Sequence, residues 1–418
     1  MKKKLKILLV SKYNYPRGGD CTNVSAIFKL LEEHGHEVRI FSMHHPKNSK
    51  YTYEKDFVSY IDFPEELAKK GLKSKIRAFT RMLYSKETRI KFKKILKEFK
   101  PDVIHMHNIH KHLTSSIILE ANKQKIPVVW TLHDYNLICA NISFLSNGKI
   151  CERCKQHRYL GPLMEKCYKR SISASAILSA ENLIYDLENV KRRISTFISP
   201  SKFLKNKFLE YGYPEDKIVV LPYSYPKNDT AIQQYASTSN KINKYYLYIG
   251  RLSPEKGIDT LCEAAKIAGV KLIIAGEGPN KEYLKSKCDC EKISFVGHKT
   301  GKELIELRKN AWFVVVPSEW YENYPFSIIE SFSDAVPVIG ANIGGIPELV
   351  KDKNTGYLFE SKNVEQLVKI LSTTAKMSST SRNKLGEAAA KFIKLTSDPE
   401  RYYKDLIKIY SSVIMEAK

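Results

Sequence analysis

Long hydrophobic runs are missing from this sequence. The longest, such as Leu5–Val10 and Phe313–Val316, are far shorter than the roughly 20 apolar residues of a transmembrane helix. The basic start Met1–Lys4 resembles the charged region of a signal peptide, but Lys6 interrupts the apolar stretch behind it and no small-residue cleavage site follows. We therefore expect a cytoplasmic chain without a transmembrane helix, and we interpret the stretch that includes Lys6 as a β-strand.

The sequence also lacks the signs of a disulfide framework. Its eight cysteines stand in a chain without an export signal, so we interpret them as thiols or metal ligands. Cys139, Cys151, Cys154 and Cys167 fall close together, two of them in a C-x2-C knuckle, and four thiolates can close a tetrahedral zinc site. Residues 134–170 carry little apolar pattern, so a structural zinc would supply stability there. Four unligated thiols are the alternative.

Acidic residues are too few to balance the basic ones. The formal net charge is +24 and the pI is near 9.4, which indicates an anionic partner such as nucleic acid, an acidic membrane surface or a phosphorylated substrate. Aromatic residues are not interleaved with the basic runs, as stacking platforms for bases would require. This pattern argues against nucleic acid.

Short β-type runs alternate with helix-length segments, which predicts parallel sheets covered by helices. Two domains are expected, because 418 residues with 43% hydrophobic content exceed what one core usually holds. Residues 224–243 are polar with little apolar periodicity, so we place the connection between the domains there. The predicted strands are Leu5–Val10, Val38–Ser42, Val103–Met106, Val128–Leu132, Tyr245–Ile249, Lys271–Ala275, Ile293–Val296, Phe313–Val316 and Val336–Ile339.

The end of the chain carries a helical stripe. It follows a helix-start signal at 397–400, and its spacing predicts a helix with one face packed on another element. The stripe consists of Tyr403, Leu406, Ile407, Tyr410, Val413 and Ile414.

Two glutamates stand eight residues apart after the predicted strand Phe313–Val316. If Pro325 or Phe326 opens the following helix, its free backbone N–H groups and Glu330 in its second turn face the crevice beyond the strand's carboxyl end. Ionised carboxylates are strong acceptors for the hydroxyls of a sugar or a ribose. Glu322 and Glu330 are therefore candidate sugar ligands, and two solvated surface glutamates are the alternative.

The loop after the predicted strand Tyr245–Ile249 carries two cations. Gly250 is followed by Arg251 and, five residues later, by Lys256. Such a pair could neutralise a departing nucleotide diphosphate without a metal ion. The chain contains no Asp-x-Asp pair, and we expect no catalytic metal. An ordinary basic loop is the alternative.

Two further candidates lie in the first half of the chain. Gly18 and Gly19 stand between the first strand and a helical pattern, where glycine-rich turns meet phosphates, although they lack the spacing of the dinucleotide fingerprint. His133 closes another predicted strand and would emerge at the same kind of crevice, able to donate or accept hydrogen bonds. A plain tight turn and a core histidine are the alternatives.

Together these residues resemble a retaining glycosyltransferase of family 4, which has the GT-B architecture. The resemblance spans nearly the whole chain, and several motifs stand in the right order. They are Gly18-Gly19, His34-Gly35-His36-Glu37-Val38, His133-Asp134, Gly250-Arg251-Leu252-Ser253-Pro254-Glu255-Lys256-Gly257, Ala275-Gly276-Glu277-Gly278-Pro279, Phe295-Val296-Gly297, Glu322 with Glu330, and Gly344-Gly345-Ile346-Pro347-Glu348.

The resemblance implies two doubly wound Rossmann-like α/β domains that face each other across a cleft. Residues 1–223 together with 398–418 would form the acceptor-side domain, because the final helix of the family returns to it. Residues 244–397 would form the domain that binds the nucleotide sugar, with 224–243 as the linker.

The resemblance also implies a role for each candidate. Arg251 and Lys256 would clamp the diphosphate, Glu330 would bind the ribose hydroxyls, Glu322 would bind the transferred sugar, and His133 would touch that sugar from the other domain. Gly18 and Gly19 would lie near the donor phosphates, and Glu277 and Val296 would line the base pocket. The other implied donor contacts are Gly250 and the backbone of Asn323, Tyr324, Pro325 and Phe326.

The expected activity is transfer of a sugar from a nucleotide-diphosphate donor to a glycan or polyprenyl-linked acceptor, in the synthesis of capsule, exopolysaccharide or lipopolysaccharide. No carboxylate stands out as a covalent nucleophile, so we favour front-side substitution with the diphosphate taking the acceptor proton. A catalytically silent GT-B scaffold that binds a nucleotide sugar or a partner protein is the alternative, as are an epimerase and a phosphorylase within the same fold.

Two basic amphipathic patterns suggest a membrane contact. In the first, Leu72, Ile76, Phe79 and Leu83 alternate with basic residues, and such a helix could dock on acidic lipid headgroups. The second, near 91–99, leads into a predicted strand and is expected to face the core. The basic residues of the first pattern are Lys69, Lys70, Lys73, Lys75, Arg77 and Arg81.

Overall fold

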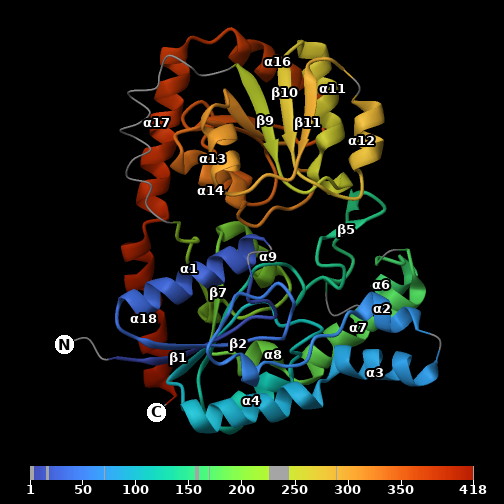
Figure 1. Ribbon diagram of the computed structural model, residues 1–418, viewed down its shortest axis with the longest axis vertical. Helices are drawn as coiled ribbons and strands as arrows, with labels where there is room; N and C mark the ends of the chain where they lie inside the picture. The colour runs from blue at the N-terminus through green and yellow to red at the C-terminus, as the bar shows by residue number, and fades with distance from the viewer. Residues whose placement is uncertain are drawn as a thin grey trace. The chain divides into compact units, whose positions relative to one another are not determined.

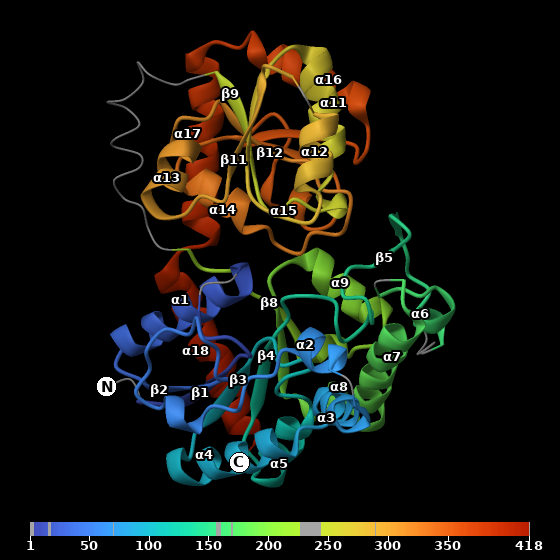
Figure 2. The same cartoon turned by 45° about the vertical axis from the view of Figure 1, so that its right-hand side comes forward.

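The computed structural model describes residues 4–15, 18–69, 71–155, 160–168, 170–225, 244–288 and 290–417. Its internal contacts divide the chain into two units (Figures 1 and 2). Unit 1 consists of Met1–Ser224 and Glu400–Lys418, and unit 2 consists of Tyr225–Pro399. From residue 226 onward, the predicted linker lies outside the described residues.

Unit 1 contains a six-stranded sheet in the order β2-β1-β3-β4-β7-β8, and every neighbouring pair of strands is parallel. The strands are β1 (Lys6–Val10), β2 (Glu37–Phe41), β3 (Val103–Met106), β4 (Val128–Thr131), β7 (Thr196–Ser199) and β8 (Ile218–Val220). The helices of this unit are α1 (Gly19–Glu33), α2 (Phe63–Ala68), α3 (Leu72–Leu83), α4 (Lys86–Phe99), α5 (Ser116–Lys123), α6 (Gly161–Met164), α7 (Ile172–Leu187), α8 (Val190–Arg193), α9 (Lys202–Glu210) and α18 (Pro399–Glu416).

Both faces of the unit 1 sheet are covered, which explains its continuous apolar strands. Ile7 and Leu9 of β1 join the core cluster that includes α1 and α18. On the other face, Phe41 of β2 contacts Phe92 of α4, with 5.1 Å between ring centroids. Helix α4 in turn packs along α5. Side chains that alternate along a strand therefore pack against two different layers of helices.

Helix α18 is anchored to unit 1 by apolar and polar contacts. Its buried stripe, which contains Leu406 and Val413, belongs to the core cluster of this unit. Two tyrosines of the stripe also bond buried histidines: Tyr403 Oη lies 2.9 Å from His36 Nε2, and Tyr410 Oη lies 2.7 Å from His105 Nδ1. The predicted amphipathic helix is thus present.

Unit 2 contains a second six-stranded parallel sheet, in the order β11-β10-β9-β12-β13-β14. Numbered within the unit, this is the 3-2-1-4-5-6 order of a doubly wound fold. The strands are β9 (Tyr245–Ile249), β10 (Lys271–Ala275), β11 (Ile293–Gly297), β12 (Phe313–Val316), β13 (Val338–Ala341) and β14 (Gly356–Phe359).

Helices cover both faces of the unit 2 sheet. Figures 1 and 2 show α11, α12 and α16 on one face and α13, α14 and α17 on the other, in agreement with the close packing of α11 on α16 and of α14 on α17. The helices are α11 (Ile258–Ala268), α12 (Lys281–Lys287), α13 (Gly301–Lys309), α14 (Phe326–Ser333), α15 (Ile346–Leu349), α16 (Val364–Ala375) and α17 (Ser379–Thr396).

These two sheets confirm the predicted α/β class. Four of the predicted strands, β3, β9, β10 and β12, have the predicted ends. Strands β7, β8 and β14 were not predicted, because their apolar runs are short. Among the described residues, no helix is long and apolar enough to span a membrane.

The cysteine-rich segment of unit 1 has little regular structure. It contains the two-stranded hairpin β5 (Leu145–Ser146) and β6 (Lys149–Ile150) together with α6. Burial and, to a smaller extent, neighbouring sulfurs raise the pKa of two of the thiols: Cys154 acts on Cys139, and Cys167 and Cys151 act on Cys154. Yet no three metal-ligating side chains of the described residues are arranged to hold an ion. Zinc at this cluster stays a prediction.

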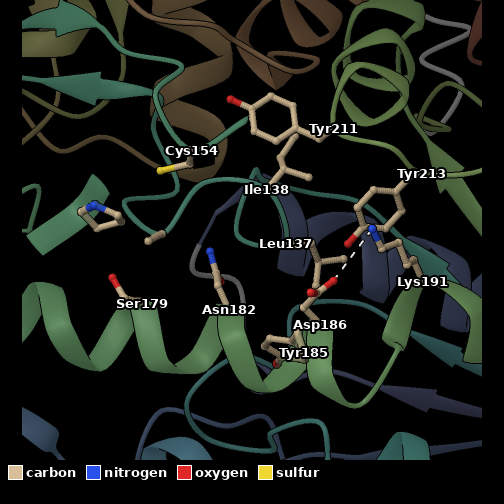
Figure 3. Close-up of a pocket in the computed structure, with 12 residues that line it drawn as sticks. Leu137, Ile138, Cys154, Ser179, Asn182, Tyr185, Asp186, Lys191, Tyr211 and Tyr213 are labelled. Atoms are coloured by element: carbon tan, nitrogen blue, oxygen red, sulfur yellow. Dashed lines mark ion pairs between the residues drawn. The ribbon is translucent and has the colours of Figure 1, made fainter. Parts of the chain in front are cut away.

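A cavity of about 50 Å³ lies beside this segment in unit 1 (Figure 3). Cys154 and Tyr211 line it together with Ser179 and Asn182 of α7. A space of this size admits a few water molecules.

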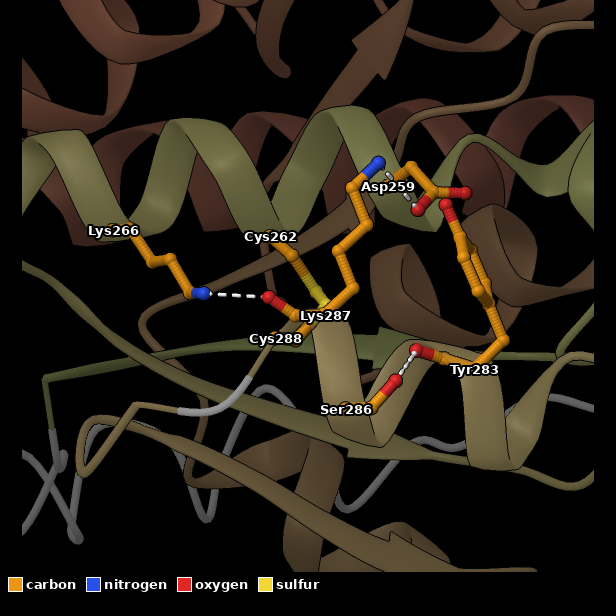
Figure 4. Close-up of a disulfide and its surroundings, with 7 residues drawn as sticks. All are labelled: Asp259, Cys262, Lys266, Tyr283, Ser286, Lys287 and Cys288. Carbon is orange, nitrogen blue, oxygen red and sulfur yellow. Dashed lines mark hydrogen bonds and ion pairs between the residues drawn. A yellow bond between two sulfur atoms is a disulfide. The ribbon is translucent and has the colours of Figure 1, made fainter.

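One pair of cysteines corrects the expectation of free thiols. Cys262 of α11 and Cys288, which follows α12, form a disulfide in unit 2 (Figure 4). The two residues are 26 positions apart, and only the packing of α12 against α11 brings them together. Beside them, Lys287 pairs with Asp259 at 3.0 Å.

Candidate active site

The loops after β9 and β12 meet in unit 2, because these neighbouring strands are where the strand order reverses. Doubly wound sheets bind ligands beyond the carboxyl ends of their strands at this point. The loop 250–257 follows β9 and the loop 317–325 follows β12. Gly257, with φ of 67°, joins them: a Cβ atom there would lie 1.9 Å from the carbonyl oxygen of Pro317, so only glycine fits.

A buried carboxylate forms the centre of this site. Glu322 is 8% exposed, and its Oε1 atom accepts hydrogen bonds from three side chains. The donors are Nζ of Lys256 at 2.7 Å, Oγ of Ser318 at 2.7 Å and Nε1 of Trp320 at 2.8 Å. The ammonium of Lys256 also lies 4.8 Å from the centre of the Trp320 ring. Two separately predicted candidates, Lys256 and Glu322, are thus in direct contact.

These donors keep Glu322 ionised. Burial by itself would raise the pKa of Glu322, but the charge of Lys256 and the three hydrogen bonds outweigh it and hold the pKa below its ordinary value. A carboxylate with one oxygen already saturated is rigidly oriented. It can present its second oxygen to a hydroxyl group with strong hydrogen-bonding power.

Arg251 differs from Lys256 in its surroundings. Its side chain is exposed and has no hydrogen-bond or ion-pair partner within the described parts of the chain. Its backbone is fixed, because the carbonyl oxygen accepts a hydrogen bond from Oη of Tyr248 at 2.8 Å. An unpaired guanidinium on a fixed loop can bind an anion without first breaking an ion pair.

The segment 322–326 is held in place by Gly345. The N–H of Gly345 donates to the carbonyl of Glu322 at 2.6 Å, and a Cβ atom on Gly345 would lie 2.0 Å from the carbonyl oxygen of Asn323. Tyr324 is buried, Pro325 caps α14, and the helix begins at Phe326, as predicted. The backbone of residues 322–325 therefore lies directly before the N-terminus of α14.

Glu330, in the second turn of α14, is also paired. Its Oε2 atom accepts a hydrogen bond at 2.9 Å from the buried guanidinium of Arg308, which bonds Asp334 at 2.6 Å as well. Burial raises the pKa of Glu330 although Arg308 acts against it. Sequence analysis did not predict Arg308, because a basic residue near a helix end has no distinctive local signal.

The two residues predicted for a base pocket are close together. The carbonyl of Gly297, next to Val296, accepts a hydrogen bond from the N–H of Gly276, next to Glu277. Glu277 is half exposed and pairs with Lys281 at 2.7 Å. Gly250 belongs to the same set of loops through its N–H, which donates to the carbonyl of Ala275 at 3.1 Å.

Unit 1 has its own cluster of polar residues at the carboxyl ends of β1, β3 and β4. Gly18 precedes α1, which begins at Gly19. The next residue, Asp20, accepts a hydrogen bond from Nδ2 of Asn108 at 2.7 Å. Burial would raise the pKa of Asp20, but neighbouring His133 and Lys12, with the amide of Asn108, lower it.

His133 has partners on both ring nitrogens. Nε2 lies 2.9 Å from Nδ1 of His107, and Nδ1 lies 2.8 Å from Oη of Tyr223. Burial lowers the pKa of His133 to about 4, although Asp20 acts in the opposite direction, so the ring is neutral near pH 7. A hydrogen bond from His133 to a ligand would replace one of these two contacts.

Sequence analysis did not predict His107, Asn108 or Asp20. The first two directly follow the predicted strand β3, so the rule that placed His133 at a strand's carboxyl end could have found them. The pairing of His107 with His133 has no such signal, because it depends on the register of β3 and β4.

The unit 2 site combines groups suited to one kind of ligand. Arg251 and Lys256 can hold phosphate oxygens, and Glu322 and Glu330 can accept hydrogen bonds from hydroxyl groups. The N-terminus of α14 adds free backbone N–H groups. The combination fits a molecule with both a diphosphate and sugar hydroxyls.

Two protein-family models match the chain, one in each half. The model for Glycosyltransferase Family 4 matches residues 22–224, and the model for Glycosyl transferases group 1 matches residues 229–392. Together they cover most of the sequence and include every candidate of the unit 2 site.

Similar proteins are known from sequence and structure. An uncharacterized 42.6 kDa protein in the cps region of Klebsiella pneumoniae is 24% identical over 367 residues, which are 85% of this chain and 90% of that protein. The lipopolysaccharide 1,2-N-acetylglucosaminetransferase of Salmonella typhimurium is 30% identical over 183 residues, covering 38% of this chain and 47% of that enzyme. The crystal structure of Anabaena HepE with UDP-glucose aligns with a TM-score of 0.65 at 14% identity, covering 98% of this chain and 100% of HepE.

Proposed function

Since the chain belongs to the GT-B glycosyltransferases of the family 4 type, we propose that it is a retaining enzyme that uses a nucleotide-diphosphate sugar. The acceptor in this proposal is a glycan or a polyprenyl-linked sugar, and the product is a bacterial surface polysaccharide. Relatives support this class of product, because one lies in a cps region and another acts on lipopolysaccharide. Anabaena HepE, a protein of similar fold, was crystallised with UDP-glucose, and this supports the class of donor.

The observation that carries the proposal is the contact between Lys256 and Glu322. Nζ of Lys256, the proposed cation for the diphosphate, lies 2.7 Å from the carboxylate of Glu322, the proposed ligand of the sugar hydroxyls. In a nucleotide sugar, these two chemical groups are joined at the anomeric carbon. Arg251, exposed on the same loop as Lys256, supplies a second cation.

In the proposed mechanism, side chains rather than a divalent ion absorb the charge of the leaving diphosphate. As the glycosidic bond breaks, negative charge grows on the diphosphate, and Arg251 and Lys256 stabilise it more strongly than in the ground state. The acceptor hydroxyl attacks from the same face and transfers its proton to a diphosphate oxygen. Glu322 orients the sugar throughout, and a hydrogen bond from His133 to the sugar stays part of the proposal.

A nucleotide-release assay tests this function. Purified protein is incubated with a panel of UDP-sugars and GDP-sugars and with a lipid-linked acceptor extract, and free UDP or GDP is measured. We expect release with one donor, loss of release in Glu322→Ala, and no change in Lys391→Ala, an exposed cation of α17. NMR of the product then gives its anomeric configuration.

The outcomes separate the competing functions. A new glycoside with inverted configuration refutes the retaining mechanism. Nucleotide binding without release from any donor supports the silent scaffold instead. Conversion of the donor without a new glycoside supports an epimerase.

We also propose that unit 1 contacts an anionic membrane surface through α3. Ile76 and Phe79 of this helix are 52% and 43% exposed, and the basic residue Lys73 is exposed beside them. By contrast, the apolar face of α4 is buried, as predicted for the second basic pattern. Of the basic residues predicted for the first pattern, Arg81 bonds Glu87 within unit 1, and Lys70 lies outside the described residues.

Liposome sedimentation tests this contact. We expect binding to vesicles with phosphatidylglycerol but not to pure phosphatidylcholine, and a loss of binding in the triple variant Lys73→Gln, Ile76→Ser, Phe79→Ser. Ile267→Ser, which changes an exposed isoleucine of unit 2, is the control. Binding that is insensitive to salt and to the triple substitution would contradict the proposal.

A further inference from the structure

Arg308 is a buried guanidinium at the end of α13. Its side chain is 4% exposed, and a charge at such depth is costly unless it is paired and hydrogen-bonded. Two carboxylates, one in α14 and one directly after it, supply the pairing: Nε and Nη2 lie 2.6 Å from Oδ2 of Asp334, and Nη1 lies 2.9 Å from Oε2 of Glu330. The three residues form one closed ion cluster.

The two carboxylates of the cluster differ in exposure. The side chain of Asp334 is 1% exposed, whereas that of Glu330 is 25% exposed. Asp334 therefore serves to fix Arg308, and only Glu330 can reach a ligand. Without the guanidinium that pairs with both, the two negative charges would repel each other.

The geometry leaves one oxygen of Glu330 for a ligand. Oε2 is occupied by Arg308, while Oε1 has no hydrogen-bond partner among the residues that the structure describes. A carboxylate held on one side by a fixed guanidinium points its other oxygen in a defined direction.

We propose that Arg308 is a positioning residue that sets how tightly the site distinguishes a ribonucleotide from a nucleotide without ribose hydroxyls. The inference rests on the proposed function, in which Glu330 accepts a hydrogen bond from the ribose. Arg308 itself does not touch the ligand in this proposal. It fixes the direction in which Glu330 points, so among the contacts to the ligand its loss acts on the ribose contact.

Arg308 has a further partner, Tyr225, at the start of unit 2. The guanidinium of Arg308 donates a hydrogen bond to the phenol oxygen of Tyr225, while burial raises the pKa of that phenol to about 12. The N–H of Tyr225 bonds the carbonyl of Ser397 at 3.0 Å. Arg308 thus has three side-chain partners, which leaves its guanidinium little freedom to rotate.

Unit 2 contains a matched control for a buried arginine. Arg382 of α17 is fully buried and donates to the backbone carbonyls of Ala311, Trp312 and Ala335. None of these carbonyls belongs to the proposed ribose contact. Replacing Arg382 should lower stability without changing ribose recognition.

Calorimetric titration with four nucleotides tests the proposal. UDP and GDP are compared with their 2′,3′-dideoxy forms, and the ratio of dissociation constants, dideoxy over ribo, is measured for the better base. For the unchanged protein we expect a ratio of about 10 to 100, the value of a charge-assisted hydrogen bond. In Arg308→Met, as in Glu330→Gln, the ratio should fall below about 3. In Arg382→Met it should stay unchanged.

A milder variant covers the case in which Arg308→Met does not fold. Lysine keeps the charge but cannot donate in parallel to two carboxylates, so Arg308→Lys should lower the ratio at least about 3-fold while circular dichroism shows a folded protein. A ratio that stays the same in a folded Arg308 variant, or that falls equally in Arg382→Met, overturns the inference.

Failure of the proposed function gives a different result. If the unchanged protein binds neither UDP nor GDP, that function is refuted and the role of Arg308 falls with it. If it binds nucleotide but does not distinguish the dideoxy form, only the role of Arg308 is refuted.

Discussion

Replacing Lys256 by methionine should destabilise unit 2 in a way that depends on pH. In the folded protein, the ammonium of Lys256 donates to a carboxylate that is otherwise served by Ser318 and Trp320. Methionine fills similar space but cannot donate. Glu322 would then be a buried carboxylate with only neutral donors.

The size of the effect follows from the burial of the pair. Removing one partner of a fully buried ion pair costs about 3–5 kcal/mol, and a charge-assisted hydrogen bond contributes about 1.5–3 kcal/mol. The side chain of Lys256 is 23% exposed and that of Glu322 is 10% exposed. Solvent therefore screens part of the interaction, and we expect a loss of about 2–3 kcal/mol near neutral pH.

The direction of the pH dependence follows from the pKa of Glu322. Since its pKa is lowered by folding, the pair stabilises the protein above the ordinary pKa of a glutamate, and this stability is lost as the pH falls through the lowered value. In Lys256→Met, the charge that opposes burial is gone, so burial raises the pKa of Glu322. The difference between the two proteins should therefore be small near pH 4 and largest above about pH 7.

Urea unfolding at about pH 4.5 and about pH 7.5, followed by tryptophan fluorescence, measures this difference. The control is Lys281→Met, because Lys281 also lies 2.7 Å from a carboxylate, that of Glu277, whose side chain is 49% exposed. Exposed pairs contribute at most about 1 kcal/mol. Equal losses in the two variants, or a loss in Lys256→Met that does not change with pH, would refute the reasoning.

Three further predictions concern other parts of the chain. Arg251→Ala should slow sugar transfer by on the order of 10²-fold in the nucleotide-release assay, as does the loss of one preorganised donor in other enzymes; an unchanged rate would exclude a role in catalysis. Tyr410→Phe leaves a nitrogen of buried His105 without its partner, so thermal unfolding should show a loss of about 1–3 kcal/mol. Cys151→Ser with Cys154→Ser should abolish bound zinc in elemental analysis, and zinc-free unchanged protein would disprove that site.

The sequence by itself determined the elements of the fold and where their polar ends lie. Apolar runs of strand length are local signals, and so is the stripe of α18. A residue just beyond a parallel strand must lie at the carboxyl edge of the sheet, which is why Arg251, Glu322 and His133 could be selected without coordinates. Resemblance to a family then supplied their roles.

Only the tertiary structure decided which side chains meet. Lys256 and Glu322 are 66 positions apart, and their contact depends on β9 and β12 being neighbours. The pairing of Cys262 with Cys288 depends in the same way on α11 and α12. Such contacts are absent from local patterns, because strand order and helix packing are set by the whole core, not by the residues that come together.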